Sequence, residues 1–125
     1  MARRSFAKRQ DKNHNAVRDY LRKHGVEVIE IFNPLDLLVY HQGFTALVEV
    51  KDETDNKQVY TDVQIKFISE HRLPIIFATG EEQSLNAIKQ RQIVTERQKQ
   101  ALAGMLLRNK KPIYTAKDVR DAINN

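Results

Sequence analysis

The 125-residue sequence contains no cysteine, which excludes disulfide bonds and zinc sites built from thiolates. Nothing therefore points to an oxidising compartment. The sequence also lacks any apolar run near the roughly 20 residues that a membrane-spanning helix needs. Residues 1–12 are basic but lack the apolar core of a secretory signal. We expect a cytoplasmic protein with no membrane partner.

The charge balance is basic, with 21 lysine and arginine residues against 16 acidic ones and a formal net charge of +5. Such an excess favours polyanions, nucleic acid above all. A solvated basic surface that binds no nucleic acid explains the same charge equally well. Composition therefore admits DNA as a partner without requiring it.

A chain of this length fits one compact domain, and its hydrophobic periodicity predicts an α/β fold. Apolar residues at helical spacing indicate helices, and short runs rich in leucine, valine and aromatic residues indicate strands. Two of the expected strands are apolar on both faces, which favours a mixed central sheet flanked by helices. The expected core order is α-β-β-β-α-β-α. It begins with a helix at 11–24 that stops at Gly25, followed by strands at 26–32, 35–40 and 44–51 and a loop at 52–60. A helix at 61–71 with Val63, Phe67 and Ile68 inward, a strand at 74–79, and a helix to about 88 that a Thr79–Glu82 capping box opens complete the core.

The composition changes beyond about residue 89, and the chain divides into three regions. Residues 1–10 are expected to be a basic flexible arm, residues 11–90 the α/β core, and residues 91–125 a helical extension. The last helix of the extension should begin at Thr115, with Asp118 completing its cap. The extension is expected to pack on the core or to form a dimer surface, and a crude helix-turn-helix is a third arrangement.

The hairpin predicted at residues 35–51 brings acidic residues together. A tight turn at residues 42–43 sets a register in which Asp36 lies opposite Glu49. Opposed residues share a sheet face with Cβ atoms about 5 Å apart, where like charges are destabilising. A divalent cation would offset this repulsion, because magnesium prefers such oxygen ligands, and the Val50 carbonyl could add one more. Lys51 projects to the same face as Glu49, since side chains alternate along a strand.

These three side chains suit hydrolysis of a phosphodiester bond. A bound metal ion lowers the pKa of its water and stabilises charge on phosphate oxygens, and Lys51 could orient the water or neutralise that charge. Mg²⁺ is the expected cofactor, with Mn²⁺ as a substitute. In a structural interpretation, Asp36 caps the turn after Pro34, while Glu49 and Lys51 lie on a solvated strand face. Spacing alone leaves both interpretations open.

The order of these motifs resembles a known family. Segments 33–36 (NPLD) and 47–51 (LVEVK), followed by Thr61 and Gln64, resemble the PD-(D/E)XK nuclease superfamily. Within it, the likeness is to small phage VRR-NUC and Holliday junction resolvase-like proteins, and it spans roughly residues 11–88. The resemblance implies a restriction-endonuclease-like core and a magnesium-dependent endonuclease that hydrolyses DNA. It favours branched or otherwise structured DNA as the substrate.

The resemblance also assigns roles to further residues. Gln64 would hold the attacking water or a backbone phosphate, although Thr61 and Gln64 at this spacing also form a capping box that explains both without catalysis. The family's Pro-Asp pair carries one inserted residue here. Its glutamate in the first helix falls near His14, and Asp11 is the only nearby acid, which makes both accessory candidates. The four histidines lack paired metal-ligand spacing, which indicates surface or capping positions.

Basic residues are candidates for contacts with DNA phosphates, each of which would add salt-dependent affinity. The N-terminal arm could lie along the backbone or remain a mobile tail. The candidates are Arg3, Arg4, Lys8, Arg9, Arg18, Lys57 and Lys66.

Two other functions stay open from the sequence. The missing glutamate in the first helix supports a non-cleaving DNA-binding or anti-host interaction module on a degenerate nuclease fold. An RNA-processing endonuclease would use no metal. If the substrate is a four-way junction, two coordinated cuts are needed, and that activity would predict a two-fold symmetric homodimer.

Overall fold

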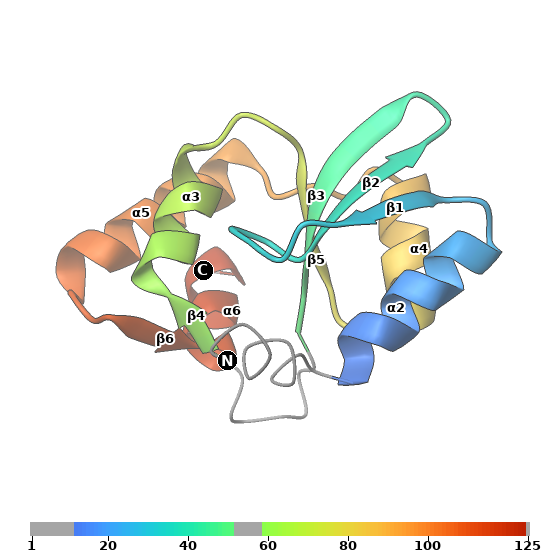
Figure 1. Cartoon of the computed structure of the whole chain (residues 1–125). Coiled ribbons are helices and arrows are strands. Elements are labelled where there is room, and N and C mark those ends of the chain that lie inside the picture. The colour runs from blue at the N-terminus through green and yellow to red at the C-terminus, as the bar shows by residue number, and fades with distance from the viewer. Residues whose placement is uncertain (1–11, 52–58, 125) are drawn as a thin grey trace.

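The centre of the molecule is a mixed four-stranded sheet, seen in a computed structural model that describes residues 12–51 and 59–124 (Figure 1). The strand order is β1-β2-β3-β5. The first three strands pair antiparallel, and β5 pairs parallel to β3. A parallel pair needs a crossover, which helix α3 provides. The strands are β1 (Glu27–Glu30), β2 (Leu37–His41), β3 (Phe44–Val50) and β5 (Ile75–Ala78).

Helices cover both faces of this sheet, and two separate groups of buried apolar side chains fill the space between the layers. One face carries α2 (Lys12–Lys23) and α4 (Glu81–Lys89), which pack on each other. The other face carries α3 (Asp62–Glu70), α5 (Glu96–Arg108) and α6 (Ala116–Asn124). This arrangement is the helix-flanked α/β fold that the sequence predicted. Within the described residues, no helix is long and apolar enough to cross a membrane.

The hairpin register is the one that the turn residues predicted. Tyr40 pairs with Thr45 and Leu38 with Leu47, and Gly43 adopts a φ of 82° in the turn. Such a positive φ is accessible to glycine at little cost, which sets the position of the turn and hence of the strands. The same register, extended by one residue beyond the Leu37–Val48 pair, places Asp36 opposite Glu49.

The first helix also follows its sequence signals. It ends at Lys23, and Gly25 has a φ of 85° immediately after it. The amide N–H of Val26 then donates to the carbonyl of Leu21 at 3.0 Å, a closing bond of a helix terminus.

Three local expectations were wrong. Val63 is 66% exposed, and Ile65 takes the inward position on α3 instead. The N-cap of α4 is Gly80, without a side-chain cap, so the predicted Thr79–Glu82 capping box does not form. Because the N-cap is one residue later than predicted, the third residue of the helix is Gln83 and not Glu82. The Oε1 of Gln83 accepts a hydrogen bond from the Thr79 N–H at 2.8 Å.

The third error concerns a small second sheet. Residues 59–60 fall in a short strand, β4 (Val59–Thr61), rather than in the expected loop. It pairs antiparallel with β6 (Ile113–Thr115), a strand that no periodic pattern indicated. Three-residue strands carry too little alternation to be recognised, and tertiary pairing alone brings these segments together.

The C-terminal helices belong to the core on their side of the sheet. Leu102 and Met105 of α5 are buried in the same cluster as Ile65 and Ile68 of α3. Capping boxes open two of these helices: Thr95 with Gln98 at α5, and Thr115 with Asp118 at α6, the latter as expected. The apolar face of α5 is thus used for packing within the chain.

Candidate functional site

Glu49 is a carboxylate buried inside the sheet. It is 1% exposed and lies in β3 on the face toward α3, together with Leu47. The pKa of Glu49 is raised to about 8, because burial and then the Asp36 carboxylate raise it by more than the Lys51 ammonium lowers it. Its Oε1 has no hydrogen-bond partner among the described residues. A buried polar atom without a partner is costly, so this position favours a proton or a cation beside the carboxyl oxygen.

Asp36 continues the hairpin ladder one residue before β2 begins. Its N–H donates to the carbonyl of Val48 at 3.1 Å, and its Oδ2 accepts from the N–H of Val50 at 2.8 Å. These bonds place the Asp36 side chain beside the end of β3, where its charge acts on Glu49. The predicted opposition of Asp36 and Glu49 is therefore present. The alternative of a solvated strand face is wrong for Glu49, because that carboxylate is almost fully buried.

Lys51 completes the group. Its Nζ lies 2.9 Å from Oε2 of Glu49 and 4.8 Å from the centre of the Tyr60 ring. The side chain is 17% exposed, so it reaches from the buried carboxylate toward solvent. The backbone N–H of Lys51 donates to the carbonyl of Ala78 at 2.9 Å, which prolongs the pairing of β3 with β5 and holds the side chain in place.

Gln64 forms the capping box that its spacing predicted, and it also lies beside Glu49, while its role toward water or phosphate stays a prediction. Its Oε1 accepts from the N–H of Thr61 at 3.1 Å, within the capping box of α3. Its Nε2 donates to the carbonyl of Pro34 at 3.1 Å and lies 3.5 Å from Oε2 of Glu49. The helix cap thus anchors an amide beside the candidate site. The Val50 N–H binds Asp36, and a ligand role for the Val50 carbonyl stays a prediction.

His14 is at the site, contrary to the surface or capping position that the histidine spacing indicated. It is 2% exposed, with Nδ1 3.7 Å from Oδ1 of Asp36 and Nε2 3.6 Å from Oε1 of Glu30. Burial lowers the pKa of His14, but Asp36 and Glu30 outweigh it, and the pKa lies above the ordinary histidine value. The missed signal is helical: His14 precedes the buried residues Val17 and Leu21 by three and seven positions.

Of the remaining candidates, only Arg18 and Lys66 lie within the described residues. Arg18 binds the carboxylates of Asp19 and Glu30, so its guanidinium is engaged within the α2 side of the molecule. Lys66 is exposed on α3. The other residues proposed for DNA or accessory contacts, namely Arg3, Arg4, Lys8, Arg9, Asp11 and Lys57, lie outside the described residues.

The donor set fits one class of metal better than others. Within residues 12–51 and 59–124, no three histidine, cysteine, aspartate or glutamate side chains form a metal site by themselves. Two carboxylates, Asp36 and Glu49, share the site, and one oxygen of Glu49 is unpartnered. Magnesium usually takes one or two protein carboxylates and completes its shell with water and phosphate, whereas structural zinc takes four protein ligands. The residues therefore fit a magnesium-type ion.

Comparisons with known proteins identify no relative of this chain. No protein-family model, curated protein or solved structure matches the chain. The PD-(D/E)XK likeness accordingly rests on the motifs and on their arrangement alone.

Proposed function

We propose that this chain is a metal-dependent endodeoxyribonuclease with a restriction-endonuclease-like core, similar to PD-(D/E)XK enzymes. The observation that carries the proposal is the buried, unpartnered Oε1 of Glu49, with Asp36 and Lys51 gathered around the same carboxylate. Purely structural residues rarely combine two acids and a buried orphan oxygen, since the arrangement costs folding free energy. A hard cation held here would satisfy the oxygen and offset the repulsion that arises when Glu49 ionises beside Asp36.

Each side chain has a specific task in this proposal. Asp36 and Glu49 would hold Mg²⁺ or Mn²⁺, which supplies a water of lowered pKa and stabilises charge on phosphate oxygens. The Nε2 of Gln64 and the Nζ of Lys51 both contact Oε2 of Glu49. The other oxygen, Oε1, would therefore be the one available to an ion. Because Lys51 also reaches solvent, its ammonium can donate to a phosphate oxygen of a bound backbone. Tyr60 supports that ammonium through its ring.

The test is a cleavage assay on purified protein. Labelled duplex, flap, four-way junction, single-stranded and plasmid DNA are each incubated with Mg²⁺, with Mn²⁺ or with chelator. We expect nicking that needs the metal and is lost in Asp36→Asn, and we expect branched DNA to be cut fastest. If a four-way junction is the preferred substrate, light scattering should show a dimer, because two coordinated cuts need two sites.

Lys51→Ala separates chemistry from binding. The rate of a single turnover should fall about a hundredfold or more, as for loss of a group that stabilises developing charge. DNA affinity in chelator should stay within a few-fold, since one partly buried ammonium contributes little to non-specific binding. An unchanged rate would remove Lys51 from the mechanism.

A second function is favoured by one observation. The side chain that α2 brings to Asp36 is a histidine, His14, and not a further carboxylate. A site with one acid fewer would suit a non-cleaving DNA-binding or anti-host module that keeps the nuclease core. DNA binding without any metal-dependent nick would support this module, and cleavage of an RNA substrate that survives chelation would indicate a metal-free, RNA-processing type of endonuclease.

A further inference from the structure

An open groove of about 620 Å³ runs between the start of α3 and the segment that joins α5 to β6. Tertiary folding forms it, because its two walls are far apart in the sequence. A backbone hydrogen bond of 3.0 Å from the Asp62 N–H to the Pro112 carbonyl ties the walls together. The groove is therefore part of the fold and does not depend on the placement of one side chain.

Three lysines line this groove: Lys66 from α3, and Lys110 and Lys111 from the segment after α5. All three are exposed. Among the described residues, neither Lys66 nor Lys110 has a carboxylate within ion-pair distance, while the charge of Lys111 acts on Asp118. The Lys66 and Lys110 ammonium groups remain available to an external anion.

One acid offsets this charge only in part. Asp62 also lines the groove, and its Oδ1 accepts from the N–H of Val63 at 2.8 Å, at the first turn of α3. Three cations against one anion leave the groove positive. Its apolar surface comes from Val63, Leu106, Pro112 and Tyr114, which lie between the charged side chains. An extended chain of phosphates with sugars between them matches this surface better than a small anion does.

The groove and the candidate site lie on opposite sides of helix α3. Asp62 and Lys66 are four residues apart and share one side of α3, while Gln64 points from the other side toward Glu49. The width of a helix, about 10 Å, therefore separates the groove from the site. In Figure 1 the start of α3, the small β4–β6 sheet and the end of β3 all lie toward the lower edge of the view. This separation is well within one helical turn of duplex DNA, about 34 Å.

We propose that this groove binds the phosphate backbone of DNA next to the bond that is cut. The proposal rests on the proposed function, because it places the substrate relative to that site. It assigns to Lys110 and Lys111, in the C-terminal extension, a role that the core motifs do not cover. It also gives the extension a function in addition to packing.

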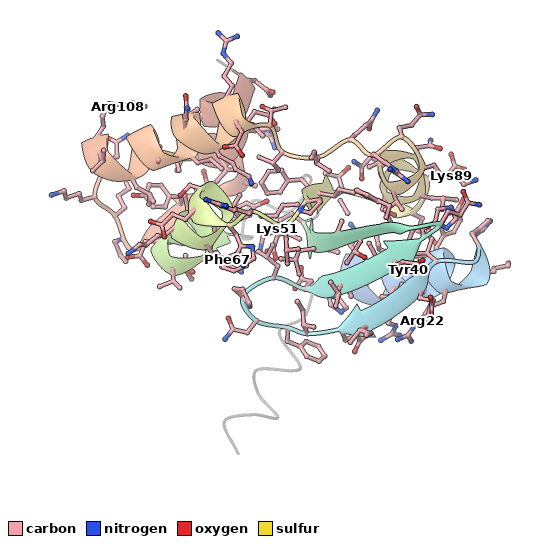
Figure 2. All side chains as sticks on the ribbon, turned by 90° about the horizontal axis from the view of Figure 1, so that it is seen from above. Arg22, Tyr40, Lys51, Phe67, Lys89 and Arg108 are labelled. Atoms are coloured by element: carbon pink, nitrogen blue, oxygen red, sulfur yellow. The ribbon has the colours of Figure 1, made fainter. Side chains whose placement is uncertain are left out.

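The experiment measures DNA binding by the full chain in chelator, so that cleavage does not enter. Fluorescence anisotropy follows a labelled duplex of about three helical turns across a series of salt concentrations. The groove variant is Lys66→Gln/Lys110→Gln/Lys111→Gln. The control, Lys23→Gln/Arg72→Gln/Lys89→Gln, removes the same charge from exposed positions elsewhere, and Figure 2 shows Lys89 across the molecule from Arg108 at the end of α5.

We expect the groove variant to lose about tenfold or more in affinity at moderate salt, with the slope of log K against log salt reduced by about 0.9 for each lost phosphate contact. The control should change little in either quantity. Equal losses in both variants would overturn the proposal, since net charge would then explain the binding. Lys66→Glu alone, in the middle of α3, repeats the test with one substitution if the triple variant folds poorly.

Two further outcomes separate this proposal from its alternatives. If the groove variant alone loses DNA affinity while the wild type cuts no DNA with any metal, the groove stands and the nuclease proposal fails. Polyglutamate serves as a competitor of another class. If it binds the wild type but not the groove variant, while DNA binds both equally, the groove takes acidic protein and the proposal is wrong.

Discussion

The two faces of strand β3 differ sharply. Toward α2 and α4, the strand presents Ala46, Val48 and Val50, which lie in a continuous apolar cluster. Toward α3, it presents Leu47 and then Glu49, a buried carboxylate with an orphan oxygen. One face therefore stabilises the fold, and the other carries a group that costs stability. The alternation of side chains along a strand allows a single segment to do both.

The largest expected effect comes from placing a charge on the apolar face. Val48→Asp puts a carboxylate at a position that is fully buried and has no cationic neighbour in its cluster. An uncompensated buried charge costs about 3–5 kcal/mol, which exceeds much of the stability of a small domain. We expect loss of cooperative urea unfolding, measured by circular dichroism. Thr45→Asp, at an exposed position of the same strand, should stay within about 0.5 kcal/mol of the wild type.

The opposite substitution on the other face should not harm the fold. Glu49→Gln keeps the shape of the side chain but cannot ionise, so it removes the charged form that burial and Asp36 make unfavourable. We expect metal-dependent cleavage to fall by about a hundredfold or more, and Mn²⁺ affinity to fall with it, because a ligand is lost. The melting temperature without metal should be unchanged or higher. If the variant unfolds, Glu49 is structural, and both faces of β3 then serve to stabilise the fold.

Two glutamines in equivalent capping positions, Gln64 and Gln98, test whether Gln64 contributes to cleavage in addition to capping α3. Gln64 and Gln98 each complete a capping box, at α3 and α5 respectively, but only Gln64 also reaches Glu49. Replacing either with alanine should cost about 1 kcal/mol in urea unfolding. Only Gln64→Ala should also slow cleavage, by about tenfold through loss of a group that orients a metal ligand. Equal rates in the two variants would assign Gln64 to the cap alone.

The smallest expected effect concerns α6, which covers the face with the site. The Asp118 carboxylate accepts a hydrogen bond from the backbone N–H of Thr115, and the Thr115 side chain also interacts with it. Both interactions lower the pKa of Asp118 below its ordinary value. A lowered pKa contributes stability that is present above the unfolded value, about 4, and is lost as the pH falls through the folded value. Asp118→Asn should therefore be slightly less stable than the wild type in urea at neutral pH. The difference should vanish near pH 2, and a difference that persists there would point to shape and not to charge.

Local signals in the sequence predicted the elements that depend on near neighbours. The hairpin register follows from Gly43, which accepts the positive φ of the turn, and the opposition of Asp36 and Glu49 follows from that register. The end of α2 follows from Gly25 in the same way. Such features need only a few consecutive residues, so they can be read without knowledge of the whole fold.

Contacts between distant segments could not be read in this way. His14 looked like a surface histidine, yet α2 packs so that its ring meets Asp36 and Glu30. The groove lysines Lys66 and Lys110 share no motif, and β4 and β6 are too short to show a period. In each case a side chain's surroundings depend on packing between elements, which sequence spacing does not encode.

The sequence by itself determined the order of the helices and of the strands in the main sheet, the hairpin turn, and the face of β3 that Glu49 shares with the following Lys51, because these follow from backbone preference and a period of two. Only the tertiary structure decided that Glu49 is buried, that His14 and Gln64 adjoin the acids, and that the extension forms one wall of a basic groove. Burial and charge environment are properties of several packed elements at once, and no single segment contains them.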